Sequence, residues 1–354
     1  MKTILLPWII KQKEKIDYYT LSSNPMATSY LLDNTKDIVW YYFIKLQNYE
    51  TMYFIGRNVD KVIMKMKTND CPLSYIKRIF WNEISSNPNA IELLERHPRK
   101  LSWRRLCGNI NAISILEKNV YRIDDFGWRC LSGNINAISI LEQNIDRIDW
   151  YELSGNINAI SILEQNIDKI DWNELSGNIN AISILEQNID KIDWYELSGN
   201  INAISILEQN IDKINWKELS GNINAISILE QNIEKINWSE LSGNINAISI
   251  LEQNVDKIDW DELSGNINAI SILEQNVDKI DWTYLSRNPM AIHLLEQNQD
   301  KIDWCYLSYN PNIFCCDYDY YKKRMDIHRE ELMMKVFHPR RLAYYLELGY
   351  DMFD

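Results

Sequence analysis

Histidine and cysteine are the side chains best suited to catalysis or metal binding, and their spacing in this sequence favours neither. The four histidines (97, 293, 328 and 338) have no Cys, Asp or Glu at the spacing of a catalytic set. The six cysteines stand at 71, 107, 130, 305, 315 and 316. The segment CCDYDYY (315–321), even with Cys305 and His328 nearby, does not match the Cys/His spacings of zinc sites. We expect reduced thiols and no metal.

Other arrangements that could support chemistry have simpler interpretations. Glu152 and Glu164 recur at the same distance in most copies of a repeat, and identical acids in every layer are typical of a solvated face. The segment GNINAIS is not the G-x-x-x-x-G-K loop that binds phosphates. Three recurring asparagines (156, 158 and 166) are expected to cap helices and to bond loop carbonyls. The sequence therefore predicts neither an enzyme nor a cofactor.

One position varies within an otherwise nearly constant pattern. The residue that follows each tryptophan changes almost every time, while other positions differ by conservative exchanges such as Ile to Val. In chain order these residues are Arg129, Tyr151, Asn173, Tyr195, Lys217, Ser239, Asp261, Thr283 and Cys305. We take the first eight as candidate partner-binding residues, one exposed side chain per layer. Neutral drift at an unconstrained surface position is the alternative, and the sequence leaves it open.

The tryptophans that precede these residues define a repeat of 22 residues. Nine of them, from Trp128 to Trp304, stand 22 residues apart, as do Trp81 and Trp103, and Tyr18 and Trp40. A longer step with DDFGW precedes Trp128. Between Trp40 and Trp81 lie 41 residues in which the pattern is nearly lost, so this stretch holds either degenerate repeats or an insertion. Close repetition at this period indicates a solenoid.

The units at the edges of the array decide between helix and strand. The segment NINAISI alone resembles a strand, but in the edge units the same positions of the repeat are occupied by NPNAIELLER (87–96) and NPMAIHLLEQ (288–297). Asn followed by Pro and a run of helix formers is typical of a helix start. We predict a first helix over 156–165 and a shorter second helix that Asp149 caps, with Glu152 three residues later and Gly155 at its end. A β-solenoid or leucine-rich-repeat-like coil is the alternative.

Such a unit cannot bury its apolar residues alone, so stability should arise between stacked units. The predicted core residues are Ile160, Ile162, Leu163, Ile170, Trp172 and Leu175. At roughly 9–10 Å per layer, about ten units would form a superhelical rod on the order of 100 Å long. We divide the chain into an N-terminal cap with degenerate repeats (1–80), the repeat solenoid (81–312) and a C-terminal helical cap (313–354).

Charge and composition limit the class of protein. Of 354 residues, 46% are hydrophobic and 25% charged, as in a folded protein. Counting Asp and Glu against Lys and Arg, residues 128–303 carry −18 and residues 1–127 carry +6, against −13 for the whole chain. No apolar run approaches the ~18 residues of a membrane span, and the N-terminal apolar patch lacks a signal-peptide cleavage site. We expect a soluble intracellular protein.

The edge pattern W-x-x-L-S-x-N-P-x-A-I-x-L-L-E-x-N, present as WNEISSNPNAIELLERHP and WTYLSRNPMAIHLLEQNQDKIDW, resembles an uncharacterised repeat family of giant DNA viruses of the Mimiviridae and their relatives. The ending EELMMKVFHPRRLAYYLELGYD is similar to a C-terminal segment common in that group. The central units depart from the pattern, because Ile replaces Pro. The resemblance implies a viral protein expressed in an infected protist. It implies no biochemical activity.

These features favour a non-enzymatic scaffold that binds a host or viral protein, because solenoids present long surfaces and this one is acidic. A structural component of a virion or fibre, formed by self-assembly, is the alternative. Binding of nucleic acid is less favoured, since an array of −18 repels phosphate. The expected location is the host cytoplasm, with association with the virion as the alternative, and no membrane is expected as a partner.

Overall fold

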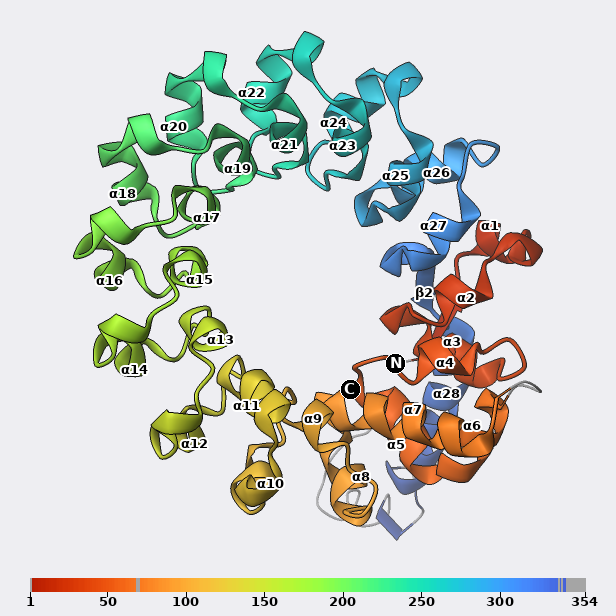
Figure 1. The fold of residues 1–354 in the computed structure, drawn as a ribbon. Coiled ribbons are helices and arrows are strands. Elements are labelled where there is room, and N and C mark those ends of the chain that lie inside the picture. Colours follow the sequence, from red (N-terminus) through yellow and green to blue (C-terminus); the bar gives the residue numbers. More distant parts are fainter. Residues whose placement is uncertain (1, 68–70, 337, 339, 342–354) are drawn as a thin grey trace.

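Short helices in two concentric layers form a closed ring around a central opening (Figure 1). This computed structural model describes residues 2–67, 71–336, 338, 340 and 341. Within these residues the only strands are the three-residue β1 (Thr3–Leu5) and β2 (Phe314–Cys316). The predicted all-α solenoid of stacked two-helix repeats is confirmed, and the β-solenoid and leucine-rich-repeat-like alternatives are wrong.

Thirteen units of the described chain each contribute one helix to the inner layer. All of these helices contain the aromatic residue that marks the repeat. They are α2 (Tyr18–Leu21), α4 (Trp40–Phe43), α7 (Leu73–Ser86), α9 (Trp103–Leu106), α11 (Asp125–Ser132), α13 (Trp150–Ser154), α15 (Trp172–Gly177), α17 (Trp194–Gly199), α19 (Trp216–Gly221), α21 (Trp238–Gly243), α23 (Trp260–Gly265), α25 (Trp282–Arg287) and α27 (Trp304–Tyr309).

The outer layer is made of equally short helices that follow or precede these in the chain. They are α1 (Pro7–Ile10), α3 (Thr28–Asp33), α5 (Tyr49–Arg57), α8 (Ile91–Arg96), α10 (Ile113–Glu117), α12 (Ile138–Glu142), α14 (Ile160–Glu164), α16 (Ile182–Glu186), α18 (Ile204–Gln209), α20 (Ile226–Gln231), α22 (Ile248–Gln253), α24 (Ile270–Gln275) and α26 (Ile292–Gln297).

Turns of 3₁₀ helix, which the repeat pattern did not reveal, connect the layers. Most lead from an outer helix to the next inner helix: η1 (Lys13–Lys15), η4 (Val120–Arg122), η5 (Ile145–Arg147), η6 (Ile167–Lys169), η7 (Ile189–Lys191), η8 (Ile211–Lys213), η9 (Ile233–Lys235), η10 (Val255–Lys257) and η11 (Val277–Lys279). The others open the outer segment of the units that have Pro: η2 (Pro25–Ala27), η3 (Pro88–Ala90), η12 (Pro289–Ala291) and η13 (Pro311–Ile313).

The inner helix begins as predicted. The Asp149 carboxylate accepts a hydrogen bond from the Glu152 backbone N–H at 3.1 Å, and Gly155 follows the last residue of α13. The second bond of a capping box is replaced, because the Asp149 N–H donates to Ser132 Oγ of the preceding unit at 3.0 Å. The Glu152 side chain is therefore free to reach toward the centre of the ring.

The outer helix is shorter than predicted. In the unit predicted to be helical over 156–165, α14 begins at Ile160, and residues 157 and 158 form a turn instead. The Asn156 side chain holds this turn by accepting from the Asn158 N–H at 3.1 Å. In the units with Pro, Asn caps a 3₁₀ turn in the same way, as Asn24 does by accepting from the Met26 N–H. Asn therefore caps a turn that precedes the helix.

Buried side chains between the two layers form one core that runs around the ring. Of the predicted core, Ile162, Leu163, Ile170 and Leu175 are buried, while Ile160 and Trp172 are half-buried and pack against it. A side chain that gains this environment only when the next layer is stacked stabilises the array by roughly 1.5–3 kcal/mol. The hydrophobic effect thus acts between units, as the repeat predicted.

A ladder of buried asparagines joins each unit to the previous one. The Asn178 side-chain amide donates to the carbonyls of Ser154 at 2.9 Å and Asn156 at 3.2 Å, and Asn180 donates to Ile157 O. The third recurring asparagine ends the outer helix, as Asn166 donates to Ile162 O. The predicted roles of the asparagines as caps and partners of loop carbonyls are confirmed.

The two ends of the array meet through the same contacts. The Asn24 amide donates to the carbonyls of Ser308 at 3.0 Å and Asn310 at 3.1 Å, and the Asp17 N–H donates to Ser308 Oγ at 3.1 Å. Lys15 lies over the Trp304 ring, as the lysines of interior units lie over the preceding tryptophan. The first unit therefore stacks on the last, and we call this interface the seam.

The last unit is built from both ends of the chain. Its inner helix is α27, but β2 follows where an outer helix would stand, and the N-terminal α1 supplies that helix instead. Trp8 of α1 contacts the Trp304 ring edge-on at 6.4 Å between ring centroids, and Gln12 bonds Gln299 of the neighbouring unit. β1 pairs antiparallel with β2, with Ile4 opposite Cys315. These contacts fasten the seam.

The repeats close into a ring, so the prediction of an open superhelical rod is wrong. Neighbouring units make most of their contacts through their inner helices, so each unit is a wedge with its narrow side inward. A full turn shared among thirteen wedges requires about 28° per unit, and such small rotations set the shape of a solenoid. The irregular stretch after Trp40 is an insertion, because Asn87 bonds Leu46 O directly and α6 (Val59–Met66) is additional.

The predicted end segments take part in the ring. Residues 1–80 hold the first two units and the start of the third, besides the α1 and β1 that complete the last unit. In 313–354, β2 is followed by α28 (Tyr318–Val336), whose first turn lies at Lys2, where the Lys2 N–H donates to Tyr321 Oη at 2.6 Å. The remainder of that predicted cap, 342–354, lies outside the described residues.

Candidate binding surface inside the ring

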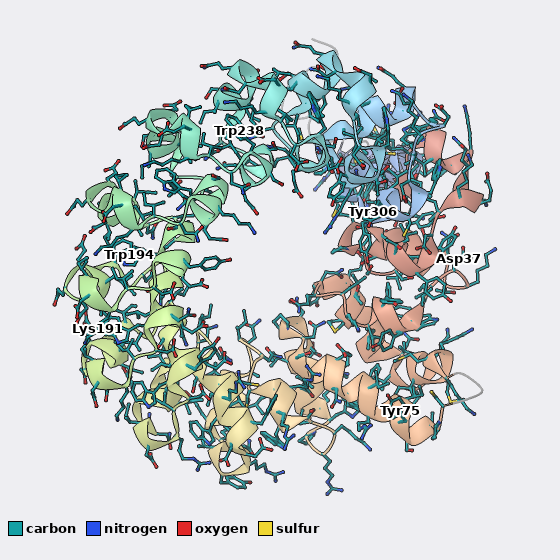
Figure 2. The ribbon with its side chains drawn as sticks, turned by 45° about the horizontal axis from the view of Figure 1, so that its top comes forward. Asp37, Tyr75, Lys191, Trp194, Trp238 and Tyr306 are labelled. Atoms are coloured by element: carbon teal, nitrogen blue, oxygen red, sulfur yellow. The ribbon has the colours of Figure 1, made fainter. Side chains whose placement is uncertain are left out.

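Helix geometry decides which side chains face the central opening. We count the aromatic residue of each inner helix as position 1. Positions 4 and 5, such as Leu175 and Ser176, are buried toward the outer layer. Since each residue turns about 100° around the helix, positions 2, 3 and 6 point the opposite way. We call these positions the inner wall. In Figure 2, Tyr306 at position 3 lies at the inner edge of the ring, and Lys191 lies at its outer edge.

The structure places all eight candidate residues at position 2 of successive inner helices, from α11 to α25. Seven are exposed and Thr283 is half-buried. Tyr151 and Tyr195 each expose about half of their surface (48% and 51%), which is much for a tyrosine. The predicted exposure is therefore found. The series follows an arc of the inner wall, because the array closes into a ring and does not extend as a rod.

Most of the larger candidate residues contact an acid of the next unit. Arg129 Nε donates to Glu152 Oε1 at 2.9 Å, and Lys217 Nζ lies 3.7 Å from Glu240 Oε1. Asn173 donates to the Asp193 carboxylate at 3.2 Å.

The tyrosines behave in the same way. The hydroxyls of Tyr151 and Tyr195 bond Glu174 and Glu218, and these hydrogen bonds raise the pKa of both phenols. The variable side chains and the recurrent acids therefore form one polar surface.

Six carboxylates at position 3 make an acidic arc of the inner wall, which we define as Glu152, Glu174, Glu196, Glu218, Glu240 and Glu262. They stand on consecutive inner helices, so the four in the middle have a like charge on both sides, and Glu152 and Glu262 have one on a single side. The pKa of Glu196 is raised, first by partial burial and then by repulsion from Asp193, Glu174 and Glu218. A bound cation would reduce the repulsion between the carboxylates of this arc.

At two places in the ring, a glycine at position 6 makes room for a carboxylate of the next unit. A Cβ on Gly155 would lie 3.3 Å from Glu174 Oε2 of the next unit, and one on Gly133 would lie 3.4 Å from Glu152 Oε2. Other units do not follow this relation: a Cβ on Gly199 would have no atom within 4 Å, and the unit of Trp40, with Lys45 at position 6, precedes a unit with Glu83 at position 3. The packed carboxylate therefore gives a physical reason for the glycine at Gly133 and Gly155.

Tyrosines form a second arc that the sequence analysis missed. This aromatic arc consists of Tyr19, Tyr41, Tyr42, Tyr284 and Tyr306, each 38–65% exposed, and it spans the seam. Tyr19 and Tyr42 meet edge-on at 6.3 Å between centroids, and Lys45 lies 4.2 Å from the centroid of the Tyr41 ring. Because these residues come from both ends of the chain, only their common positions in the repeat could have revealed them.

Arginines occupy the part of the inner wall between these two arcs. Arg104, Arg105 and Arg129 stand at positions 2 and 3 of α9 and α11. Two of them are paired, since Arg104 Nε lies 2.7 Å from Asp124 Oδ2 and Arg129 bonds Glu152. Their positive charge is thus partly neutralised within the ring.

The weaker chemical candidates are not brought together. Glu152 lies on the inner wall and Glu164 on an outer helix, so these two acids do not form a pair. Among the described residues, no three His, Cys, Asp or Glu side chains are grouped as metal ligands. In the same part of the chain, no helix has the length and apolarity needed to cross a membrane.

Known proteins offer no direct guide to this surface. Comparisons with protein-family models, with curated protein sequences and with solved structures found no match to this chain. The class that the fold itself defines is a closed ring of α-helical repeats.

Proposed function

We propose that the protein is a non-enzymatic scaffold whose inner wall binds a positively charged segment of a protein partner. The observation that carries the proposal is the coincidence of two series on one surface: the variable residues at position 2 and the six carboxylates at position 3. Residues that differ from layer to layer supply discrimination, while the carboxylates supply attraction and steer the approach.

The aromatic arc extends the proposal to arginine in particular. A guanidinium group stacks on tyrosine faces and pairs with carboxylates through two hydrogen bonds, whereas an ammonium group does neither as well. An arginine-rich segment inside the ring would meet carboxylates on one side and tyrosines on the other. On the resemblance to giant-virus repeats, we propose a viral protein that acts in the cytoplasm of the infected host cell, with a host or viral protein as partner.

The structural alternative is less favoured by the closed ring. An open solenoid exposes a repeat face at each end, and these faces could stack end to end into a fibre. Here both faces are buried against each other at the seam. Nucleic acid is also less favoured, because the acidic arc would repel the phosphates of a strand inside the ring.

The test measures the binding of three labelled peptides of equal length, rich in arginine, lysine or glutamate, by fluorescence anisotropy. We expect the arginine peptide to bind best, the glutamate peptide not to bind, and added salt to weaken binding. Replacing the six glutamates of the acidic arc by glutamine should abolish binding. Its matched control replaces six outer glutamates of the same units, which changes the net charge equally: Glu164, Glu186, Glu208, Glu230, Glu252 and Glu274.

The variable residues are tested by a second variant, in which positions 151, 173, 195, 217, 261 and 283 are changed to serine to match Ser239. Circular dichroism checks that both variants are folded. A partner retained by wild type and by the outer control, but lost by the serine variant, supports recognition by the variable series. Equal binding by all of these proteins, or preference for a single-stranded oligonucleotide, would exclude the proposal.

A further inference from the structure

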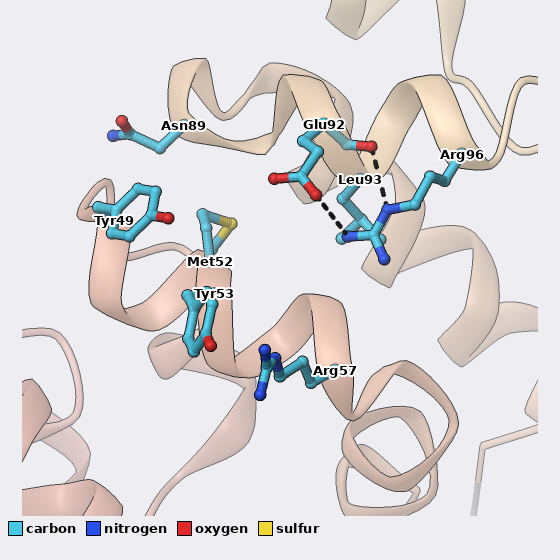
Figure 3. A pocket seen from close by; sticks show the side chains of 8 residues that line it. All are labelled: Tyr49, Met52, Tyr53, Arg57, Asn89, Glu92, Leu93 and Arg96. Carbon is cyan, nitrogen blue, oxygen red and sulfur yellow. Dashed lines mark hydrogen bonds and ion pairs between the residues drawn. The ribbon is translucent and has the colours of Figure 1, made fainter.

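One groove of the outer layer differs from the others. Between two regular units the groove is lined by acidic, aliphatic and amide side chains, as at Glu186, Ile206 and Gln209, where the cavity is about 410 Å³. Between α5 and α8 the cavity is about 210 Å³, and tyrosines and arginines surround it (Figure 3). This groove lies beside the insertion, on the opposite side of the layer from the inner wall.

The residues that line this groove replace the repeat consensus. Arg96 stands where regular units have the glutamine of the outer helix (Gln165), and Glu92 stands where they have Ser161. On the other side, α5 has nine residues instead of five or six, and it adds Arg57 in its last turn. The two arginines are therefore features of this groove and not of the repeat.

Two arginines line the cavity, Arg57 from α5 and Arg96 from α8 (Figure 3). Arg96 reaches across from α8 to α5. Its Nη2 would lie 3.2 Å from a Cβ added to Gly56, the residue that precedes Arg57 in α5. Glu92 pairs with Arg96 at 3.7 Å, but its side chain is 84% exposed and can turn to solvent. Arg57 lies over the Tyr53 ring at 4.4 Å, and within the described chain it has no carboxylate at ion-pair distance. This part of the cavity carries excess positive charge.

Beside the arginines the cavity is lined by two tyrosines above an apolar floor. Tyr49 and Tyr53 stack with centroids 6.1 Å apart, and Tyr49 is 70% exposed. Buried Met52 and Leu93 lie beneath them. The cavity is smaller than the 300–1,000 Å³ typical of drug-sized ligands, so it suits a single ring.

We propose that this groove binds a small aromatic phosphate, with the phosphoryl group held between Arg57 and Arg96 and the ring resting against Tyr49. Guanidinium groups bind phosphate oxygens through paired hydrogen bonds, and a phosphate dianion matches two of them once Glu92 turns away. The groove is separate from the inner wall, and it is independent of the function proposed above.

The test uses phenyl phosphate, phenol and inorganic phosphate as probes of the full chain, by isothermal titration calorimetry. Phenyl phosphate should bind at least about tenfold more tightly than either of the other two, because each supplies only half of the contacts. Arg57→Gln should weaken phenyl phosphate by at least about tenfold, and Arg57→Lys should restore only part of the affinity. Tyr49→Ala should weaken phenyl phosphate but not inorganic phosphate.

Arg147→Gln is the matched control, because Arg147 is an exposed arginine elsewhere on the outer part of the ring. It should leave binding unchanged. All of these substitutions are at exposed positions, so the ring should stay folded, as circular dichroism can verify. Equal affinity for phenyl phosphate and inorganic phosphate, or binding that Arg57→Gln does not alter, would overturn the proposal.

Discussion

The seam gives the sharpest prediction, because its contacts have matched copies inside the ring. Asn24 joins the first unit to the last, and Asn178 joins two interior units with the same pair of hydrogen bonds. The interior interface lies within a continuous chain, whereas at the seam the chain joins the first unit only to α1, and α1 is held to α27 of the last unit by noncovalent contacts such as that of Trp8 with Trp304. The two substitutions Asn24→Ala and Asn178→Ala should therefore cost similar free energy but have different structural consequences.

The magnitude follows from the bonds that are lost. Each alanine removes two hydrogen bonds to carbonyls in a buried position and a third that holds the following turn. A lost bond costs about 0.5–1.5 kcal/mol, and a buried carbonyl left unpaired costs more. We expect each variant to lose about 2–4 kcal/mol of interface free energy. At the seam this loss favours separation of the first unit from the last.

Hydrogen exchange distinguishes the two cases. In Asn24→Ala, the amide of Asp17, which donates to Ser308 across the seam, should exchange faster, together with the amides that pair β1 with β2. In Asn178→Ala these amides should keep their protection, and small-angle scattering should show unchanged dimensions. A seam that exchanges no faster in Asn24→Ala than in Asn178→Ala would refute the reasoning that the ladder holds the ring closed.

Three further outcomes are expected. Trp8→Ala removes a buried aromatic ring that packs on Trp304, so it should cost roughly 3–5 kcal/mol in chemical denaturation and speed hydrogen exchange in β1 and β2. The pKa of Glu196 is raised in the folded chain, so as the pH falls the folded chain takes up this proton before the unfolded chain does. Glu196→Gln should therefore raise Tm at neutral pH, and this gain over wild type should shrink as the pH is lowered and Glu196 becomes protonated. Burial raises the pKa of Cys107 to about 12, whereas Cys305 is exposed, so mass spectrometry after mild alkylation should find Cys305 modified and Cys107 protected.

Local chemistry made the unit predictable from sequence. Asp149 before Trp150 and Gly155 at the helix end defined the inner helix, because capping depends on residues within one turn. The alternation of Ile and Leu gave most of the core for a similar reason. The start of the outer helix was misplaced, because the Asn156 side chain stabilises a turn before Ile160 that uses the same residue type as a helix cap.

Closure was not predictable from the repeat, because it depends on a small rotation per unit that accumulates over the whole array. Lys15, Asp17 and Asn24 did carry a signal, since they stand at the spacing of Lys169, Asp171 and Asn178. Recognising the first residues as part of a unit would have required knowing that its other half lies some 300 residues away. The interpretation of these residues as a terminal cap followed from the assumption of an open array.

Closure also changes what the variable residues can do. On an open rod they would be accessible to any partner from the side, but on the inner wall they are reached only from within the ring. Under the proposed function, a partner enters in one of two ways: a free end of a chain passes through the opening, or the seam separates and closes again around the segment. The second route breaks the Asn24 bonds, the contact of Trp8 with Trp304 and the pairing of β1 with β2. If a partner has folded domains on both sides of its binding segment, the stability of the seam would then set the rate of its uptake. A short linear peptide would bind without breaking these contacts.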